Sequence, residues 1–374
     1  MAIYELNNIR KDANYSNGKL KSTSPVVKVF NGMAQGVELN SLISSTITKE
    51  NLDNSVNYIK SLGDKAQNGD SAAIAELNAM RRFIIEPLLL EEVKMLGIFG
   101  SYQSLAFGDS IERETSVLAG EKSRIQAPNG DVVYPTWMRD KYTVPSVTIS
   151  GGYAIDYRAI ANGEMSKENQ GMEQVRVDIR NQAALYVVKT VYAAIKAATG
   201  VKYWSEAATI VQASLDRIVN GVRRFGPTSI LGAYAAVSQV NSLVGWSDGA
   251  SIHIAAAAME EIRKDGLVGS YKGSLVREIA NPFDLTATQV VGANKEFVPL
   301  MPDGLLFILP TGGKSPVMTW TRGGLTSLTG NDVSTGRVMT RFDLEVAADV
   351  AKGHEFEIGL MNDTNLSSVA SFAI

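Results

Sequence analysis

Residues 119–161 of the chain read AGEKSRIQAPNGDVVYPTWMRDKYTVPSVTISGGYAIDYRAIA, and residues 166–200 read SKENQGMEQVRVDIRNQAALYVVKTVYAAIKAATG. The first segment predicts a long two-stranded ribbon, because its β-prone runs are separated by turn signals such as Pro128-Asn129-Gly130-Asp131. An isolated hairpin is only marginally stable in water, so another molecule must hold it. The simplest candidate is a second copy of the chain, which favours a self-assembling structural protein over an enzyme.

The ribbon combines prolines and charges with few apolar positions, a pattern typical of strands outside a continuous sheet. We therefore expect its outer part to contact a neighbouring subunit. The candidate contact residues are Tyr134, Pro135, Trp137, Arg139, Asp140 and Lys141.

The second segment predicts one unusually long helix. Ser166 is a suitable N-cap and Gly200 a suitable residue beyond the C-terminus. About 30 residues at a rise of 1.5 Å give a rod of roughly 45 Å, well above the usual helix length. Apolar residues recur every three or four positions and define the face expected to be buried, namely Val175, Ile179, Ala183, Tyr186, Val187, Thr190 and Ala194.

The composition is that of a globular protein with ample material for a core. The 374 residues are 45% hydrophobic and 20% charged, with a formal net charge of −3, which argues against bulk nucleic-acid binding. The chain has no cysteine, so disulfides, thiolate nucleophiles and cysteine-ligated zinc are excluded. Neither a signal peptide nor an apolar run long enough to span a membrane is present, and the expected site is a cytoplasm.

Residues 1–47 have weak periodicity and predict an extended arm rather than a packed domain. Within residues 1–36, five basic residues stand against two acidic ones, a local net charge of +3. We expect this segment to be disordered in the free subunit and to contact neighbouring copies or nucleic acid through Arg10, Lys11, Lys19, Lys21 and Lys28.

The flanking regions predict helices and strands that are only partly interleaved, an α+β fold. Thr48 is a helix N-cap candidate, and a second helix is expected to start near Asp70-Ser71, with Pro87 as an interruption and residues 88–96 as its continuation. Residues 337–347 alternate polar and apolar side chains, which predicts a half-buried antiparallel strand.

No motif in the chain carries catalytic or cofactor chemistry. Residues 310–315 read PTGGKS and end like a phosphate-binding loop, but Ile308 replaces the first glycine and Pro316 replaces the start of the helix. His253 and His354 are the only histidines, and neither has the spacing of a metal site or a serine-hydrolase triad. We expect no catalytic residue, no cofactor and no metal.

The order of parts resembles the major capsid proteins of tailed phages with the Hong Kong 97-type capsid fold. Residues 119–156 look like the family's extended E-loop, residues 166–199 like its spine helix, and residues 340–350 like its closing P-domain strand. Residues 271–276 and 300–307 are similar to its A-domain pattern of a glycine-preceded strand and a proline-glycine turn.

The resemblance, which covers roughly residues 105–365, implies the following division: 1–47 N-terminal arm, 48–108 helical segment, 109–165 E-loop, 166–204 P-domain spine helix, 205–336 A-domain, and 337–374 P-domain return strands. The helical segment is larger than a plain arm, and a scaffold-like segment and an added domain are both open interpretations.

The implied function is that of a major capsid protein, a structural subunit of an icosahedral phage head that encloses the DNA. The implied partners are copies of the chain in hexamers and pentamers, with scaffolding, portal and decoration proteins and weak non-specific contact with packaged DNA as further candidates, and no membrane. The alternatives are an encapsulin-type nanocompartment shell, a phage tail or sheath protein and, from a different class, a carboxylate-dependent enzyme.

Overall fold

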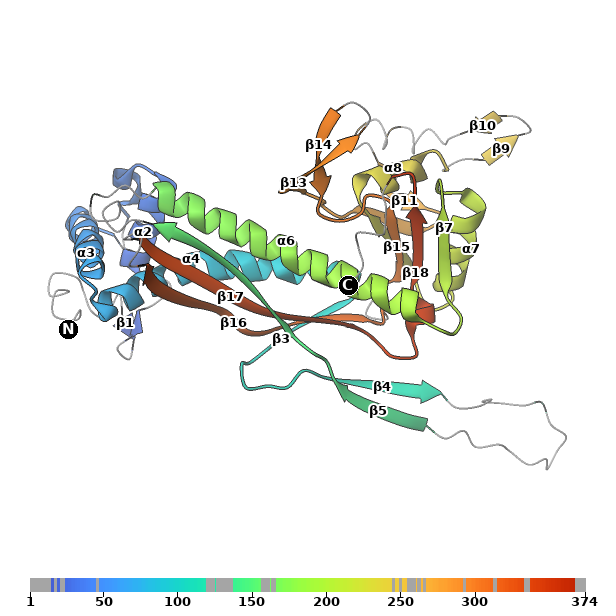
Figure 1. Cartoon of the computed structure of the whole chain (residues 1–374), viewed down its shortest axis with the longest axis horizontal. Helices are drawn as coiled ribbons and strands as arrows, with labels where there is room; N and C mark the ends of the chain where they lie inside the picture. The colour runs from blue at the N-terminus through green and yellow to red at the C-terminus, as the bar shows by residue number, and fades with distance from the viewer. Residues whose placement is uncertain are drawn as a thin grey trace.

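The computed structural model describes an elongated α+β subunit from which two-stranded ribbons project (Figure 1). The described residues are 15–16, 19–20, 24–44, 47–118, 125, 137–155, 162, 166–243, 246–248, 251–253, 260, 264, 267–291, 294–311, 315–332 and 337–366. The helices are α2 (Pro25–Gln35), α3 (Lys49–Gln67), α4 (Ser71–Lys94), α6 (Ser166–Ala197), α7 (Gln212–Arg223) and α8 (Tyr234–Asn241), with 3-10 turns η2 (Leu39–Leu42), η3 (Met95–Phe99) and η4 (Glu355–Glu357).

The strands form one four-stranded sheet, one six-stranded sheet and several separate pairs. They are β1 (Tyr15–Ser16), β2 (Lys19–Leu20), β3 (Ser101–Leu105), β4 (Glu112–Leu118), β5 (Trp137–Thr143), β6 (Val147–Ile155), β7 (Tyr203–Ala207), β8 (Thr228–Gly232), β9 (Trp246–Asp248), β10 (Ser251–His253), β11 (Ser270–Tyr271), β12 (Ser274–Glu278), β13 (Phe283–Val291), β14 (Asn294–Pro299), β15 (Leu305–Pro310), β16 (Val317–Asp332), β17 (Arg337–Val350) and β18 (Gly359–Asp363).

The long helix α6 lies along the four-stranded sheet, as Figure 1 shows. Ile179 and Val187 are buried, which confirms the face predicted from the periodicity. Glycines permit the close approach of helix and sheet. A Cβ on Gly151 of β6 would lie 3.2 Å from the Ile179 side chain, and one on Gly171 of α6 would lie 2.8 Å from the Tyr153 ring.

The four-stranded sheet has the order β3-β16-β17-β6, with β3 parallel to β16 and the other pairs antiparallel. The β16–β17 register shifts between Arg322 and Leu325, where Gly323 and Gly324 take positive φ values of 78° and 70°. These left-handed conformations favour glycine. The Leu325 N–H donates to a Glu86 carboxylate oxygen at 3.1 Å, so α4 holds the bulge in place.

Helix α2 is packed in the main core, which corrects the predictions of an extended arm and of disorder for Pro25–Gln35, while most of residues 1–23 lie outside the described residues. The Ser24 hydroxyl accepts a hydrogen bond from the Val27 N–H at 3.2 Å, and Pro25 occupies the start of the helix. Proline fits there because the first turn needs no N–H donor. The buried side chains of the helix include Val26, Val27, Val29, Phe30 and Ala34.

A buried ion pair joins α4 to the first turn of α6. The fully buried Arg81 and Glu168 side chains pair in a bidentate manner, with Arg81 Nη2 to Glu168 Oε2 at 3.2 Å. The Tyr153 hydroxyl donates to the same carboxylate at 2.7 Å, and Arg81 Nη1 donates to Asn78 Oδ1 and Thr340 Oγ1 at 3.1 Å each. The helical segment is therefore part of the body of the subunit, since its helices share one core with α6 and the sheet.

The six-stranded sheet has the order β11-β12-β8-β15-β18-β7. Helices α7 and α8 pack on one face of it, over a core cluster that includes Leu215, Val219, Ile230, Val237, Leu306 and Ile308. The opposite face joins the main core through Leu231, Phe307 and Leu309. The Phe99 and Phe307 rings meet edge to face with centroids 5.9 Å apart, so η3 and this sheet are packed together.

The hydrogen bonding divides the strands differently from the predicted boundaries. The resemblance implies that residues 205–336 form the A-domain and residues 337–374 the P-domain return strands. In the structure, β16 from the first range and β17 from the second are paired along their whole length in one sheet. The final strand β18 lies in the other sheet, between β15 and β7. The segment predicted as a single E-loop, 109–165, is likewise split, because β4 and β5 form a ribbon while β6 joins the four-stranded sheet. Backbone pairing between distant segments decides these boundaries.

Candidate assembly surfaces

Strands β4 and β5 form a two-stranded sheet of their own, which leaves the body beside the four-stranded sheet (Figure 1). The register runs from Glu112 opposite Thr143 to Leu118 opposite Trp137. Lys141 forms an exposed ion pair with Glu112. The side-chain hydrogen bond between them, together with their charge attraction, lowers the pKa of Glu112 and raises the pKa of Lys141.

The predicted ribbon contacts lie mainly on β5. This strand contains Trp137, Arg139, Asp140 and Lys141, whereas Tyr134 and Pro135 lie outside the described residues. Asp140 and Lys141 are exposed, as are Glu112 and Glu114 across the ribbon. The ribbon next to the body therefore presents charged side chains.

The predicted basic contacts are spread over different local structures. Lys28 is exposed on α2 and Lys19 lies in β2, while Arg10, Lys11 and Lys21 lie outside the described residues. The structure does not bring Lys19 and Lys28 into one extended segment, because α2 is part of the folded body.

An apolar cluster holds the root of the β4–β5 ribbon. Ile111 and Val144, which flank the ribbon, are buried together with Trp320 of β16 and Ala347 of β17. The Val144 N–H donates to the Ile111 carbonyl at 2.9 Å and so continues the ribbon pairing to its base. The ribbon is thereby attached to the sheet by side-chain burial.

A polar cluster at the same root fixes the direction of the ribbon. Arg113 of β4 donates to the Asp349 carboxylate at 3.1 Å, to the Asp349 carbonyl at 2.9 Å and to the Pro316 carbonyl at 2.5 Å. The Tyr142 hydroxyl of β5 donates to the same carboxylate at 2.6 Å, and Lys352 Nζ lies 4.2 Å from the centre of the Tyr142 ring. Burial and the bond to Asp349 raise the pKa of Tyr142 to about 12.

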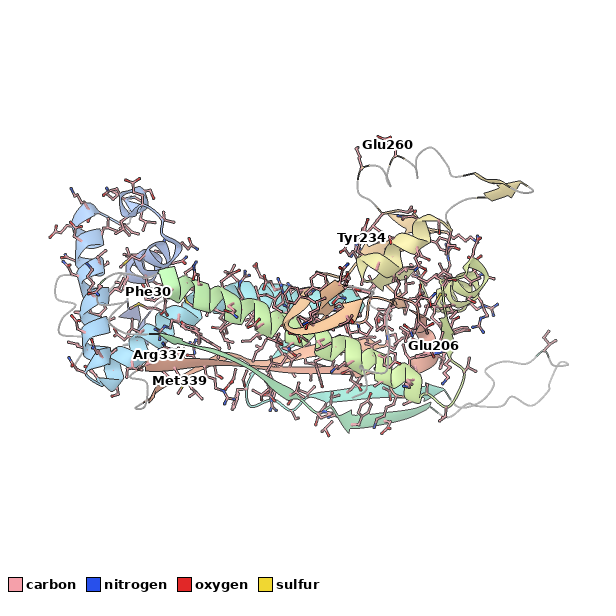
Figure 2. The ribbon with its side chains drawn as sticks, turned by 45° about the horizontal axis from the view of Figure 1, so that its top comes forward. Phe30, Glu206, Tyr234, Glu260, Arg337 and Met339 are labelled. Carbon is pink, nitrogen blue, oxygen red and sulfur yellow. The ribbon has the colours of Figure 1, made fainter. Side chains whose placement is uncertain are left out.

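A second ribbon, β13 with β14, was not predicted from the sequence. It is also a separate two-stranded sheet, and it projects from the end of the molecule that contains the six-stranded sheet (Figure 1). Figure 2, which labels Tyr234 on α8, shows the same end with the side chains drawn. Two features of the sequence could have predicted this hairpin. They are the alternation in Phe283-Asp284-Leu285-Thr286 and the turn-prone sequence Gly-Ala-Asn downstream of it.

The loop that resembles a phosphate-binding motif is a connection between two strands. Pro310 ends β15 and Val317 begins β16, so no helix follows the motif. The Ser315 hydroxyl donates to the Phe99 carbonyl at 2.8 Å, and the Thr311 hydroxyl donates to the Pro227 carbonyl at 3.0 Å. Both hydroxyl groups thus serve the junction of the two sheets.

The described residues offer no arrangement for a metal. Among them, no group of three histidine, aspartate or glutamate side chains is placed to hold a metal ion. His354 Nδ1 lies 2.8 Å from Glu357 Oε1 within one turn, and His253 lies in β10. Within the same residues, no helix is both long and apolar enough to cross a membrane.

Comparison with known proteins identifies one family across almost the whole chain. The model of the family "SPbeta prophage-derived putative capsid protein YonB" matches residues 5–362. No curated protein matches the sequence.

The chain is similar to solved structures of phage capsids and of a virus-like particle, at low sequence identity. The Microbacterium phage Oxtober96 structure has a TM-score of 0.45 and 12% identity, covering 70% of this chain and 91% of that one. The mature capsid of bacteriophage PhiM1 has a TM-score of 0.44 and 11% identity over 71% and 86%. The virus-like particle from Pyrococcus furiosus has a TM-score of 0.41 and 10% identity over 74% and 97%.

The family model matches far more than half of the chain, and the structure contains the long helix and a two-stranded ribbon of the kind that the sequence predicted. The chain belongs to the YonB family of phage capsid proteins.

Proposed function

We propose that this chain is the major capsid protein of a phage head and that it assembles with copies of itself into the hexamers and pentamers of an icosahedral shell around the DNA. The role is structural rather than catalytic. Membership of a capsid family supports this proposal and assigns the protein to the capsid of the virion.

The observation that carries the proposal is the construction of the β4–β5 ribbon. Its root is fixed by the Arg113–Asp349–Tyr142 cluster and by buried apolar side chains, while β4 and β5 beyond the root pair with each other and with no further strand of the described part of the chain. A fixed root with an otherwise separate ribbon is suited to reach across a neighbouring subunit. Fixing the root in the free subunit lowers the entropy lost on contact.

Assembly needs no single strong contact in this arrangement. Each subunit of a closed shell touches several neighbours, so weak contacts act together and the effective concentration of each further contact is high. The exposed Lys28 and the other basic residues near the N-terminus are candidates for contact with DNA or neighbours, and scaffolding, portal and decoration proteins are candidate partners.

Negative-stain microscopy of the chain expressed alone tests the proposal. Closed shells of uniform size are the expected result. Tubes would point to a tail or sheath protein, and a small soluble oligomer that never closes would contradict the shell function. Nuclease-treated particles from infected or induced cells should contain DNA, which an encapsulin-type compartment would lack.

A further inference from the structure

The β13–β14 hairpin exposes apolar side chains that its own chain does not cover. The exposed fractions are 60% for Phe283, 74% for Leu285, 71% for Val290 and 45% for Phe297. The Phe283 and Phe297 rings pack on each other with centroids 6.4 Å apart. Large apolar side chains gathered on one element indicate an interaction site, whereas single exposed ones are ordinary.

The pairing register places Phe283, Val290 and Phe297 on one face of the hairpin. Phe283 is opposite Pro299 and Val290 is opposite Lys295, so both share a face with Phe297, which lies between Lys295 and Pro299 on β14. The other face contains more polar residues, including Gln289 and Glu296, and these are exposed as well. The hairpin is therefore two-faced, with its apolar face uncovered.

The base of the hairpin is fixed to the body. The Asn281 side chain donates from Nδ2 to the Met301 carbonyl at 2.7 Å and to Asp303 Oδ1 at 2.7 Å, and it accepts from the Met301 N–H at 2.9 Å. The Leu300 N–H donates to the Pro282 carbonyl at 2.9 Å. These four hydrogen bonds hold the base of the hairpin in a defined position, which a surface loop without a binding role does not need.

The irregular part of the hairpin is also ordered by its own side chains. The register shifts between Asp284 and Thr288, and there Asp284 Oδ1 accepts from the Thr286 hydroxyl at 2.6 Å and from the Thr286 N–H at 2.9 Å. These bonds lower the pKa of Asp284. The shape of the hairpin is thus formed before any partner binds.

We propose that the apolar face of the β13–β14 hairpin docks on a second copy of this chain. This inference rests on the proposed shell function. Among the described residues, neither outer edge of the hairpin has a strand neighbour, so the backbone N–H and C=O groups of these edges can pair with another strand as the side chains become buried.

The exposed apolar area of the hairpin favours a second copy of this chain over a separate soluble partner. Four side chains with these exposures present on the order of 400 Å². A stable two-protein interface needs roughly 800 Å² from each partner. The hairpin therefore supplies about half of what a lone complex requires, and it fits a lattice in which the β4–β5 ribbon and other surfaces supply the remainder.

A pair of matched substitutions tests the inference. Val290 and Val201 are both 71% exposed, so Val290→Asp and Val201→Asp introduce the same charge at equally exposed positions. Both variants should unfold at the temperature of the wild-type subunit. Val290→Asp should lower the yield of shells at least about tenfold, because a carboxylate cannot be buried there without a partner, while Val201→Asp should keep the wild-type yield.

A label on the hairpin gives a second readout that does not depend on blocking assembly. The chain has no cysteine, so Val290→Cys and Val201→Cys each carry a polarity-sensitive fluorophore at a single position. Assembly should shift the emission of the Val290 label to shorter wavelength and leave the Val201 label unchanged.

The outcomes separate the inference from the proposed function. Wild-type yields from Val290→Asp, equal losses from both aspartate variants, or an unchanged Val290 label on assembled shells would each overturn the hairpin contact and leave the shell function intact. If the wild-type chain itself never closes into shells, the proposed function fails instead.

Discussion

The β4–β5 ribbon and the β13–β14 hairpin are both two-stranded sheets held to the body at one end, but they present different chemistry to their surroundings. The described part of the ribbon beyond its root exposes Glu112, Glu114, Asp140 and Lys141. The hairpin exposes Phe283 and Val290. The root of the ribbon is an ion-paired cluster, whereas the base of the hairpin is held by one amide side chain.

The difference bears on how a subunit stays soluble before assembly. Charges along a free strand edge discourage pairing with the wrong chain, so a charged ribbon can extend far from the body. An apolar hairpin has no such protection and is kept short and fixed at its base. The β4–β5 ribbon is thus suited to reach, and the hairpin to bury apolar area at close range.

The largest effect is expected from removing the ribbon beyond its root. Replacing residues 115–140 by Asn-Gly joins Glu114 to Lys141, which are already paired, through a turn that fits antiparallel strands. The subunit should fold, because Arg113 and Tyr142 remain, and it should form no shells. Circular dichroism and microscopy check the two parts of this expectation.

Two outcomes of that replacement would break the comparison. An unfolded product would show that the ribbon contributes to the core of its own subunit. Shells formed at wild-type yield would show that the hairpin and other surfaces suffice for assembly.

The second largest effect is expected on the stability of the subunit when the ribbon root or the hairpin base is weakened. Asp349→Ala leaves the partly buried Arg113 without its carboxylate and the Tyr142 hydroxyl without its acceptor, so we expect a loss of roughly 2 kcal/mol in unfolding free energy. Asn281→Ala removes the three hydrogen bonds of the Asn281 side chain, and we expect it to lower the free energy of unfolding by about 1 kcal/mol. Urea unfolding of both variants measures the difference, and a larger loss for Asn281→Ala would reverse the ranking of the roots.

The sequence predicted the elements whose residues face the protein's own core. The periodicity around Val187 located the long helix and its buried face, and the alternation over residues 337–347 located β17, in which Phe342 and Leu344 are buried while Arg341 is exposed. Thr48 was correctly predicted as the N-cap of α3. In these segments the local pattern and the tertiary burial agree.

The predictions from the sequence were wrong or missing where one sequence pattern is compatible with two different structures. Weak periodicity over residues 1–47 favours an extended arm, but a short helix shows little periodicity as well, and the buried Val26 and Phe30 show that α2 is part of the core. The hairpin was missed because alternating apolar residues do not reveal whether their face meets the body or another molecule. Phe283 and Val290 follow the pattern of a core strand and are nevertheless exposed.

A smaller effect is expected from titration of the ribbon root. Burial and the bond to Asp349 raise the pKa of Tyr142 from 10 to about 12, so the neutral phenol is favoured in the folded state. Its contribution is complete below pH 10 and is lost as the pH rises towards 12. Tyr142→Phe should cost about 1 kcal/mol at pH 8, and the gap to the wild type should shrink between pH 10 and 12.

Thermal unfolding of both proteins across this range measures the gap. The other buried tyrosines are present in both proteins, so their titration cancels in the difference. Arg113 and Lys352 also face the phenol, and both residues are present in the two proteins that are compared. A gap that stays constant up to pH 12 would show that the hydroxyl is not held by Asp349.

The smallest effect is expected from the exposed pair on the ribbon. Lys141→Ala removes the ion pair with Glu112, in which the side chains are 63% and 40% exposed. Water already solvates both charges, and holding two long side chains together costs entropy, so the melting temperature should not change measurably. Arg113→Ala is the matched control, because this cation lies at the root, is only 11% exposed and should lower the melting temperature clearly. Equal decreases in melting temperature for both variants would mean that pairing along the ribbon, rather than its root, sets the direction of the ribbon. The ribbon and the hairpin would then differ only in the side chains that they expose.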